Sequence, residues 1–511
     1  MLFNSYEFLF YFLPLTLGVF FALSGYRCLR AAAAWLALMS IAFYGYWSPR
    51  YIVLLMGSIV ANFAAGQAML GYLARGDKAA ARRVLVLALV ADLGALGWFK
   101  YANFFVDSVN TVAGTGWHLP AIVLPIGISF FTFTQIAFLV DTYQGKVREP
   151  RFIPYVLFVT YFPHLIAGPV LHHAEMMPQF ARDETYRFRL DNFLIGTGFF
   201  LMGLFKKVVL ADGIQPFVAP VFDAPPGVHL TLVEAWGGAL AYTLQLYFDF
   251  SGYSDMAIGL SKMFNVDLPL NFNSPYKARN IVEFWRRWHM TLSRFLRDYL
   301  YIALGGNRKG PALRYANLMA TMLLGGLWHG AGWTFVIWGG LHGAYLVVNH
   351  FWQALRQRLL GHDLARSTLP GRLASLALTF LCVVVAWVFF RATSVDAALR
   401  VLGAMAGAGG LVVPLEWRPL LGPLGGGVAF GHLDAFAGTR QLGWTAALLA
   451  MAWFLPNSQE IMARLRAGRL AVAAWPPALG WASLGGSAVV LLLLAAINAS
   501  HGVSEFIYFN F

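Results

Sequence analysis

Long apolar runs, separated by short polar loops, recur along the whole chain. Most have the roughly 17–25 residues with which an α-helix crosses the hydrocarbon core of a bilayer, about 30 Å thick. Of the 511 residues, 59% are hydrophobic and 12% are charged, whereas about 25% are charged in an ordinary soluble protein. A soluble globule of this size has no interior large enough for so much apolar side chain. The pattern therefore predicts an all-α polytopic membrane protein whose solvent is lipid.

The runs predict about eleven transmembrane helices, together with re-entrant and interfacial segments. No internal repeat, low-complexity tract or soluble domain is visible in the sequence, so residues 1–511 are expected to form a single membrane domain. Residues 315–351 are long enough to cross twice, as a hairpin with its break near 325–332. The apolar runs lie at 8–24, 31–47, 51–73, 84–105, 119–140, 152–171, 193–211, 232–260, 315–351, 373–390, 441–456 and 484–500.

Basic residues in the loops indicate the orientation of the spans. Clusters follow the first, third and fifth runs, and the loops between these clusters carry one Lys or Arg or none. The positive-inside rule then places the N-terminus in the periplasm and the clusters in the cytoplasm. Because the first run follows Glu7 and lacks a basic n-region, we expect it to be retained as a span. The clusters are Arg27 and Arg30; Arg75, Lys78, Arg82 and Arg83; and Lys146, Arg148 and Arg151.

The run 152–171 is predicted to be re-entrant. The loops on both sides of it are basic and therefore cytoplasmic, so a single full crossing does not fit. Broken backbone at membrane depth is tolerated only where protein or a water-filled cavity covers it. We expect this segment to enter the membrane and return to the cytoplasmic side. The residues that break it are Pro154, Pro163, His164, Gly168 and Pro169, and the arginines after it are Arg182, Arg187 and Arg189.

The net charge of +13 reflects these loops, and we expect no nucleic-acid partner. Two cysteines, Cys28 and Cys382, are too few for a disulfide framework or a zinc cluster. His172 and His173 adjoin each other without a third ligand at a useful spacing, so no metal site is expected. The sequence also lacks a Walker loop, a Gly-x-Ser-x-Gly elbow and an HExxH motif. These absences leave an NTPase, a serine hydrolase and a zincin unsupported.

His329 stands inside the apolar run, in the sequence Leu323-Leu-Gly-Gly-Leu-Trp-His-Gly-Ala-Gly-Trp333. An ionisable side chain at membrane depth is costly, and its default interpretation is functional. Imidazole, with a pKa near ~6.5, is suited to act as a general base at neutral pH. The alternative is a helix-packing histidine bonded to a carbonyl group. The residues alone leave both open, whereas His342 and His350 are expected to serve packing and His164 to shape a turn.

Residues 281–299 are predicted to form one amphipathic helix at the cytoplasmic interface, with Asn280 and Glu283 at its start. On a helical wheel His289 falls at the edge of the apolar arc. The segment is either an interfacial anchor, or a basic surface for an anionic donor with His289 pointing into the protein. The apolar arc holds Ile281, Phe284, Trp285, Trp288, Leu292, Phe295, Leu296 and Tyr299, and the opposite face holds Arg286, Arg287, Arg294 and Arg297.

Asp249 lies in Gln245-Leu-Tyr-Phe-Asp-Phe-Ser-Gly-Tyr-Ser-Asp255, at the expected end of an apolar span. Its carboxylate is suited to orient a histidine or to bind a cation. A capped, broken helix end is the favoured interpretation. The segment is no calcium loop, because it lacks alternating oxygen ligands and a terminal Glu.

Together these segments resemble the membrane-bound O-acyltransferases, and in particular the bacterial branch that modifies cell-surface polymers. The resemblance covers most of the chain, is densest in a core at about 90–350, and loosens beyond residue 395, where the glycine-rich stretch 403–427 is peculiar to this chain. It rests on these motifs: Trp98-Phe-Lys-Tyr-Ala-Asn-Phe104, Leu124-Pro-Ile-Gly-Ile-Ser-Phe130, Phe162-Pro-His-Leu-Ile-Ala-Gly-Pro169, Tyr247-Phe-Asp-Phe-Ser-Gly-Tyr-Ser-Asp-Met-Ala-Ile-Gly259, Phe284-Trp-Arg-Arg-Trp-His289, Arg297-Asp-Tyr-Leu-Tyr-Ile302, Leu304-Gly-Gly-Asn-Arg-Lys-Gly310 and Gly325-Gly-Leu-Trp-His-Gly-Ala331.

The resemblance implies a helical membrane fold with a thin centre that is reached from both faces. It implies that His329 is the catalytic histidine and His289 the second functional position. Residues expected to support them or to bind the donor are Asp249, Trp328, Arg286, Arg287 and Arg294.

The expected function is transfer of an acetyl group from a cytoplasmic thioester to an exported polysaccharide, of the alginate type. The donor is expected to be acetyl-CoA, with no permanently bound cofactor. Expected partners are the lipid bilayer, a periplasmic acetyltransferase and the polysaccharide synthesis machinery, at the bacterial inner membrane. Acetylation of cellulose or another surface polymer is an alternative. A transporter or flippase for polysaccharide or lipid-linked sugars is the alternative from another class, although no inverted repeat supports it.

Overall fold

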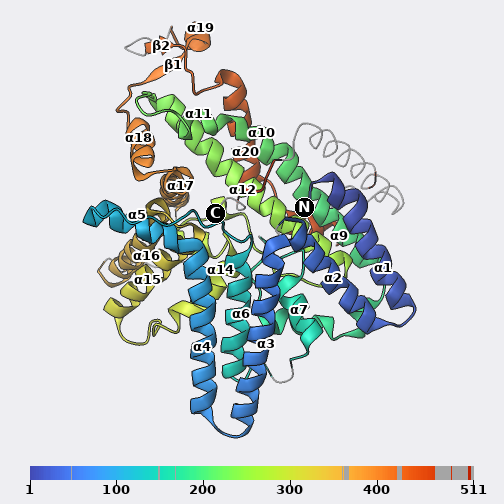
Figure 1. The fold of residues 1–511 in the computed structure, drawn as a ribbon. Coiled ribbons are helices and arrows are strands. Elements are labelled where there is room, and N and C mark those ends of the chain that lie inside the picture. Colours follow the sequence, from blue (N-terminus) through green and yellow to red (C-terminus); the bar gives the residue numbers. More distant parts are fainter. Residues whose placement is uncertain are drawn as a thin grey trace. The chain divides into compact units, whose positions relative to one another are not determined.

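A computed structural model shows a chain that is almost entirely helical where it is described, with one pair of short strands (Figure 1). The described residues are 1–47, 49–147, 150–166, 168–359, 361, 368–422, 429–466, 485 and 504–507. The chain divides into two compact units. The first comprises Met1–Phe205, Gly252–Asn271 and Ser458–Phe511, and the second comprises Lys206–Ser251 and Phe272–Asn457.

Within the described residues, five helical segments are long and apolar enough to cross a membrane. They confirm the predicted runs 8–24, 31–47, 51–73, 193–211 and 373–390. The fold is therefore that of a multi-pass helical membrane protein, while the total of about eleven spans stays a prediction. The five segments are Glu7–Gly25, Leu29–Trp47, Pro49–Ala74, Leu190–Phe222 and Leu369–Arg391.

The first unit is built from antiparallel helical pairs. Its helices are α1 (Leu13–Gly25), α2 (Leu29–Trp47), α3 (Ile52–Ala74), α4 (Lys78–Leu96), α5 (Ala102–Ala113), α6 (Ile128–Tyr143), α7 (Phe152–Thr160), α8 (His173–Phe180), α9 (Leu190–Phe205), α21 (Ser458–Arg466) and the last part of α12 (Leu232–Met263). Helix α1 packs on α2, and α6 packs against both α3 and α4. Figure 1 shows α3 and α4 as a long hairpin.

Two predicted runs of this unit are wrong in their helical extent. The run 84–105 is not one helix, because α4 gives way to a π-helical turn at Gly97–Tyr101 before α5 begins. The run 119–140 is helical only from Ile128. Two prolines precede that point and cannot continue a helix, and Gly127 has the left-handed φ of +70° at the start of α6. The predicted run 484–500 lies outside the described residues, apart from Gly485.

The run 152–171 does not form one spanning helix. Its helix, α7, has 9 residues, or about 14 Å at 1.5 Å per residue, which is well short of a bilayer. The chain then turns, with the backbone N–H groups of His164 and Leu165 donating to the carbonyl of Tyr161. A Cβ on Gly168 would collide with His164, so the turn requires glycine there. This broken helix fits a re-entrant segment, and the side to which it returns stays a prediction.

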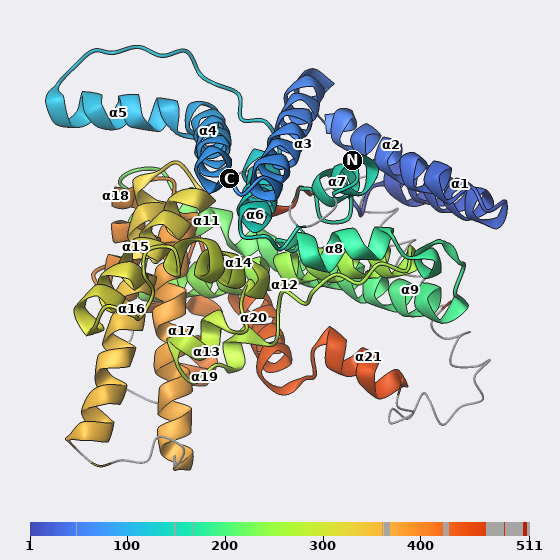
Figure 2. The same cartoon turned by 90° about the horizontal axis from the view of Figure 1, so that it is seen from below.

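The second unit contains the hairpin predicted at 315–351. Its elements are α10 (Asp212–Ile214), α11 (Ala219–Phe222), the first part of α12, α13 (Ile281–Trp285), α14 (Met290–Phe295), α15 (Pro311–His329), α16 (Trp333–Arg358), α17 (Leu369–Arg391), α18 (Val395–Met405), α19 (Arg418–Leu421), α20 (Gly438–Phe454) and the parallel strands β1 (Val412–Pro414) and β2 (Ala429–Gly431). Helices α16 and α17 run side by side (Figure 2).

The helices α15 and α16 form the hairpin, which confirms the prediction. Their backbones touch at two glycines: a Cβ on Gly326 would collide with the Phe335 carbonyl, and one on Gly339 with the Met322 carbonyl. Small residues permit such close approach between membrane helices. The break covers 330–332, so His329 is the last residue of α15 and does not lie in the break itself.

Two long-range contacts within the second unit join the region of α11 and the start of α12 to the ends of α17 and α18. The Arg391 guanidinium at the end of α17 pairs with Asp223, at 2.8 Å, just after α11. The indole of Trp236 donates to the carbonyl of Met405 at the end of α18.

Candidate active site

The two histidines singled out by the sequence meet in the second unit. The centroids of the His289 and His329 rings are 6.4 Å apart, although the residues come from α15 and from the break between α13 and α14. His289 is fully buried and His329 is 4% exposed. The two imidazoles therefore lie close together and away from bulk water.

Aromatic rings surround His329. The ring centroids of Trp328, Trp338 and Phe390 lie 4.9, 5.0 and 5.2 Å from its own. Trp328 is also 6.4 Å from His289 by ring centroids, so it borders both histidines. This apolar lining keeps water from a reactive centre and strengthens electrostatic interactions inside it.

His289 occupies a strained position that the single predicted helix did not anticipate. The predicted helix 281–299 is wrong as one element, because α13 ends at Trp285 and α14 begins at Met290. His289 lies between them with a φ of +43°, a conformation that costs a non-glycine residue of order 1–3 kcal/mol. Strain of this kind clusters at functional sites. The ring of Phe250 packs edge-on against the His289 ring, with the two centroids 4.8 Å apart.

A tertiary contact explains the break. The backbone N–H of Asn273 donates to the Arg287 carbonyl at 2.9 Å, and the Arg287 guanidinium donates to the Asn273 carbonyl at 3.1 Å. The Arg287 carbonyl therefore accepts its hydrogen bond from Asn273 and not from an N–H group further along a continuous helix. The start of the segment follows the prediction, since the side chain of Asn280 accepts from the N–H of Glu283.

The arginines do not form one continuous basic face. Arg287 pairs with Glu283 at 2.9 Å and is partly buried, whereas Arg286 is exposed. Burial raises the pKa of Glu283, but the N–H of Arg279 and the guanidinium of Arg287 outweigh it, so that the pKa is lowered. Arg294 is half-buried on α14. Of the three arginines predicted to serve a donor, Arg286 alone has the exposure of a solvent-facing side chain.

Asp249 is not at a broken helix end, so that interpretation is wrong. Helix α12 runs unbroken from Leu232 to Met263, and the Asp249 side chain is 1% exposed within it. Its carboxylate pairs with the ammonium of Lys207 at 2.8 Å, and Lys207 also reaches Asp212 at 2.9 Å. The cation that pairs with Asp249 is thus a side chain of the protein. Asp249 adjoins Phe250, whose ring contacts that of His289.

The sequence did not predict Lys207 as the partner of Asp249, nor the aromatic rings that contact the two histidines. Lys207 carried a usable signal, because a lysine inside an apolar run requires a partner. Phe250, Trp338 and Phe390 carried none, since aromatic residues are common in every membrane helix. His342 follows the prediction of a packing residue: its ring lies 4.8 Å from that of Trp338 by centroids and is fully buried.

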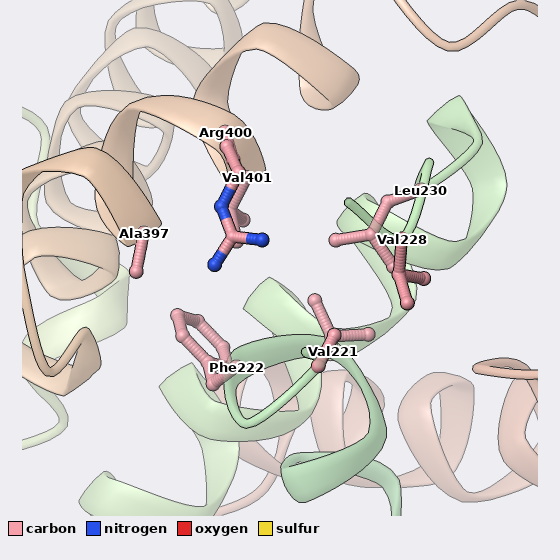
Figure 3. Close-up of a pocket in the computed structure, with 8 residues that line it drawn as sticks. Val221, Phe222, Val228, Leu230, Ala397, Arg400 and Val401 are labelled. Carbon is pink, nitrogen blue, oxygen red and sulfur yellow. The ribbon is translucent and has the colours of Figure 1, made fainter. Parts of the chain in front are cut away.

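A small pocket of about 20 Å³ lies elsewhere in the second unit, between α11 and α18. Val221, Phe222 and Val401 form part of its apolar lining, and the guanidinium of Arg400 reaches toward Phe222 (Figure 3). No histidine lines it, so it is distinct from the histidine pair. Among the described residues, no group of three or more His, Cys, Asp or Glu side chains is placed to share a metal ion.

A buried pair of imidazoles beside the end of a membrane hairpin is suited to general acid–base catalysis by a membrane-embedded enzyme. The family model of the membrane-bound O-acyltransferases matches residues 34–385. The chain belongs to this family and is therefore an O-acyltransferase of the membrane. Membership also removes the support for a transporter.

Curated relatives agree with this family. The chain is 43% identical to the peptidoglycan O-acetyltransferase of Helicobacter pylori, over 80% of this chain and 81% of the relative. It is 45% identical to the probable alginate O-acetylase AlgI of Azotobacter vinelandii, over 79% and 78% of the two chains. A teichoic acid D-alanyltransferase of Bacillus subtilis is more distant, at 26% identity over 55% of this chain and 72% of the relative.

Proposed function

We propose that this protein transfers an acetyl group from a cytoplasmic thioester, acetyl-CoA, toward a periplasmic polysaccharide of the alginate type. The observation that carries the proposal is the buried pair formed by His289 and His329, whose ring centroids are 6.4 Å apart. The relatives named for acetyl transfer support the choice of acyl group. No permanently bound cofactor is required, because both reactants are brought to the site.

The proposed chemistry is a direct acyl transfer. The acceptor hydroxyl attacks the thioester carbonyl carbon while His329 takes the hydroxyl proton, as a general base. A new C–O bond forms, the C–S bond breaks, and the proton passes to the leaving thiolate. His289, whose ring centroid is 6.4 Å from that of His329, is suited to hydrogen-bond the reacting oxygen or the carbonyl. The aromatic lining, including Trp328, excludes water that would hydrolyse the thioester.

The donor is proposed to approach from the basic cytoplasmic segment. Arg286 is exposed there and offers a cation to the phosphates of CoA. Arg287, held by Glu283, and the half-buried Arg294 support the segment that carries His289. Asp249 supports the same site from α12 through its pairing with Lys207.

A variant of His329 tests the proposal. His329→Ala should leave a folded protein and abolish polymer acetylation, because the proton acceptor is gone. The matched control is His350→Ala, on α16 of the same hairpin and only partly buried, which should keep activity. Acetyl groups are released from the purified polymer by mild alkali and quantified. Normal acetyl content in a strain that expresses only His329→Ala would refute the assignment.

The acceptor polymer is tested separately. The alginate O-acetylase relative favours alginate, and the similarly close relative named for peptidoglycan supplies a second candidate. Acetyl content is compared in the exopolysaccharide and in the peptidoglycan of a strain that lacks this gene. Loss confined to the exopolysaccharide supports the proposal, and loss confined to peptidoglycan identifies the other acceptor. Cellulose or another surface polymer is identified in the same way.

We also propose a multi-pass inner-membrane location with about eleven spans and a periplasmic N-terminus. A periplasmic acetyltransferase and the polysaccharide synthesis machinery are the proposed partners that receive the acetyl group. The orientation is tested at Glu184, an exposed residue after the re-entrant segment. A cysteine there should resist a membrane-impermeant maleimide in intact spheroplasts and react after permeabilisation. Labelling in intact spheroplasts would show that 152–171 crosses fully.

A further inference from the structure

An aromatic wall, formed by Trp338 and Phe390, borders the His329 ring. Their ring centroids lie 5.0 and 5.2 Å from that of His329, and both rings meet it edge-on. The two rings also contact each other, with centroids 5.3 Å apart, and each residue is 1% exposed. These separations are those of aromatic rings in contact. A group placed beside His329, on the side of Trp338 and Phe390, therefore contacts their ring atoms directly.

The wall is backed by further packed rings. The centroids of Phe335 and Trp387 lie 5.1 and 5.3 Å from that of Phe390. A Cβ on Gly330, directly after His329, would collide with the ring of Phe335. Protein interiors packed in this way resist displacement of a single ring. Phe390 therefore cannot move aside for a ligand without moving its neighbours.

The reaction geometry brings the acyl group of a donor near His329. A general base reaches the acceptor hydroxyl at about 2.6–3.2 Å. The attacking oxygen and the carbonyl carbon are about 3–3.5 Å apart in a reactive complex. The acyl chain therefore starts within about 7 Å of the His329 nitrogen, and a chain that extends toward the wall competes with its rings for space.

We propose that Trp338 and Phe390 set the acyl-length limit of this enzyme, admitting an acetyl group and excluding longer chains. The inference rests on the proposed transfer from a thioester. Phe390 offers the sharper test because it comes from α17, outside the α15–α16 hairpin that carries His329. The reaction is unchanged in the variants: the same C–S bond breaks and the same C–O bond forms.

Replacing Phe390 by alanine should relax the preference for acetyl over butyryl. A hydrophobic pocket discriminates a single methylene by about 10–200-fold, so the acetyl-to-butyryl ratio should fall at least ~10-fold. The matched control is Phe389→Ala. Phe389 is buried on the same helix but lies about 100° around it from Phe390, and its replacement should leave the ratio unchanged.

The experiment uses inside-out membrane vesicles from the producing strain, supplied with equal concentrations of acetyl-CoA and butyryl-CoA. Acyl groups are released from the polymer and counted by mass spectrometry. Acetyl transfer by the wild type with butyryl transfer by Phe390→Ala supports the proposal. Equal ratios in the wild type and Phe390→Ala, or equal changes in Phe390→Ala and Phe389→Ala, would overturn it. If Phe390→Ala fails to fold, Phe390→Leu carries the same test. No acyl transfer from either CoA ester by the wild type would instead refute the proposed donor.

Discussion

The backbone at His289 permits a test that separates structure from chemistry. His289→Ala and His289→Gly both remove the imidazole and leave nearly the same cavity beside Phe250, so their difference reports the backbone at φ +43°. A left-handed conformation costs a residue with a Cβ about 1–2 kcal/mol, which glycine avoids. The freer unfolded chain of the glycine variant takes back about 0.4–1 kcal/mol. Glycine should therefore be the more stable variant, by up to about 1.6 kcal/mol.

Thermal unfolding of the purified variants in one detergent, followed by tryptophan fluorescence, measures this difference. In an ordinary helix the order is reversed, because glycine is about 1 kcal/mol less favourable than alanine. Thr291, buried in α14, supplies that control pair: Thr291→Ala should unfold at a higher temperature than Thr291→Gly. A higher unfolding temperature for His289→Ala than for His289→Gly would refute the strained break. Both His289 variants should lose acyl transfer alike if the imidazole itself is needed.

Further predictions concern the interactions that hold the second unit together. Lys207→Met should destabilise the protein by about 3–5 kcal/mol because it leaves Asp249 buried without its cation. The double variant Lys207→Met/Asp249→Leu should recover most of this loss, as measured by thermal unfolding in detergent. A double variant no more stable than Lys207→Met would contradict the prediction. Gly339→Ala should lower the yield of folded protein, because its Cβ would strike the Met322 carbonyl, whereas at Gly340 the nearest atom is a leucine methyl at 3.5 Å and alanine should be tolerated. Because the pKa of Glu283 is lowered in the fold, its carboxylate stabilises the protein above the unfolded value of about 4.3 and loses this effect as the pH falls through the lower folded value. Glu283→Gln should therefore weaken the acid dependence of the unfolding temperature, and an unchanged profile would show that this pair does not contribute.

Local pattern was enough to predict much of the architecture. The spans at 8–24, 31–47 and 51–73 and the hairpin at 315–351 follow from the length of uninterrupted apolar sequence. The sequence predicted His329 within the break of this hairpin, whereas α15 continues to His329 and the break begins at Gly330. The prolines of the run 152–171 similarly predicted a broken segment, and α7 ends at Thr160.

Other features escaped prediction because their causes are distant in sequence. The wheel for 281–299 assumed continuous helical backbone, but hydrogen bonds with Asn273 break that helix at Arg287. Asp249 was expected near a helix end, whereas pairing with Lys207 stabilises it in the middle of α12. No periodicity within α12 identifies a lysine on another segment as its partner.

By itself the sequence determined that the chain is a membrane protein, where five of its spans lie, and that His329 is an ionisable side chain within an apolar run. These properties depend on hydrophobicity and on local backbone preference, which each segment carries alone. The tertiary structure alone decided that the ring centroids of His289 and His329 lie 6.4 Å apart and that the Phe390 ring packs against His329. Such contacts arise when separate helices pack, and van der Waals packing in lipid depends on the shapes of both partners.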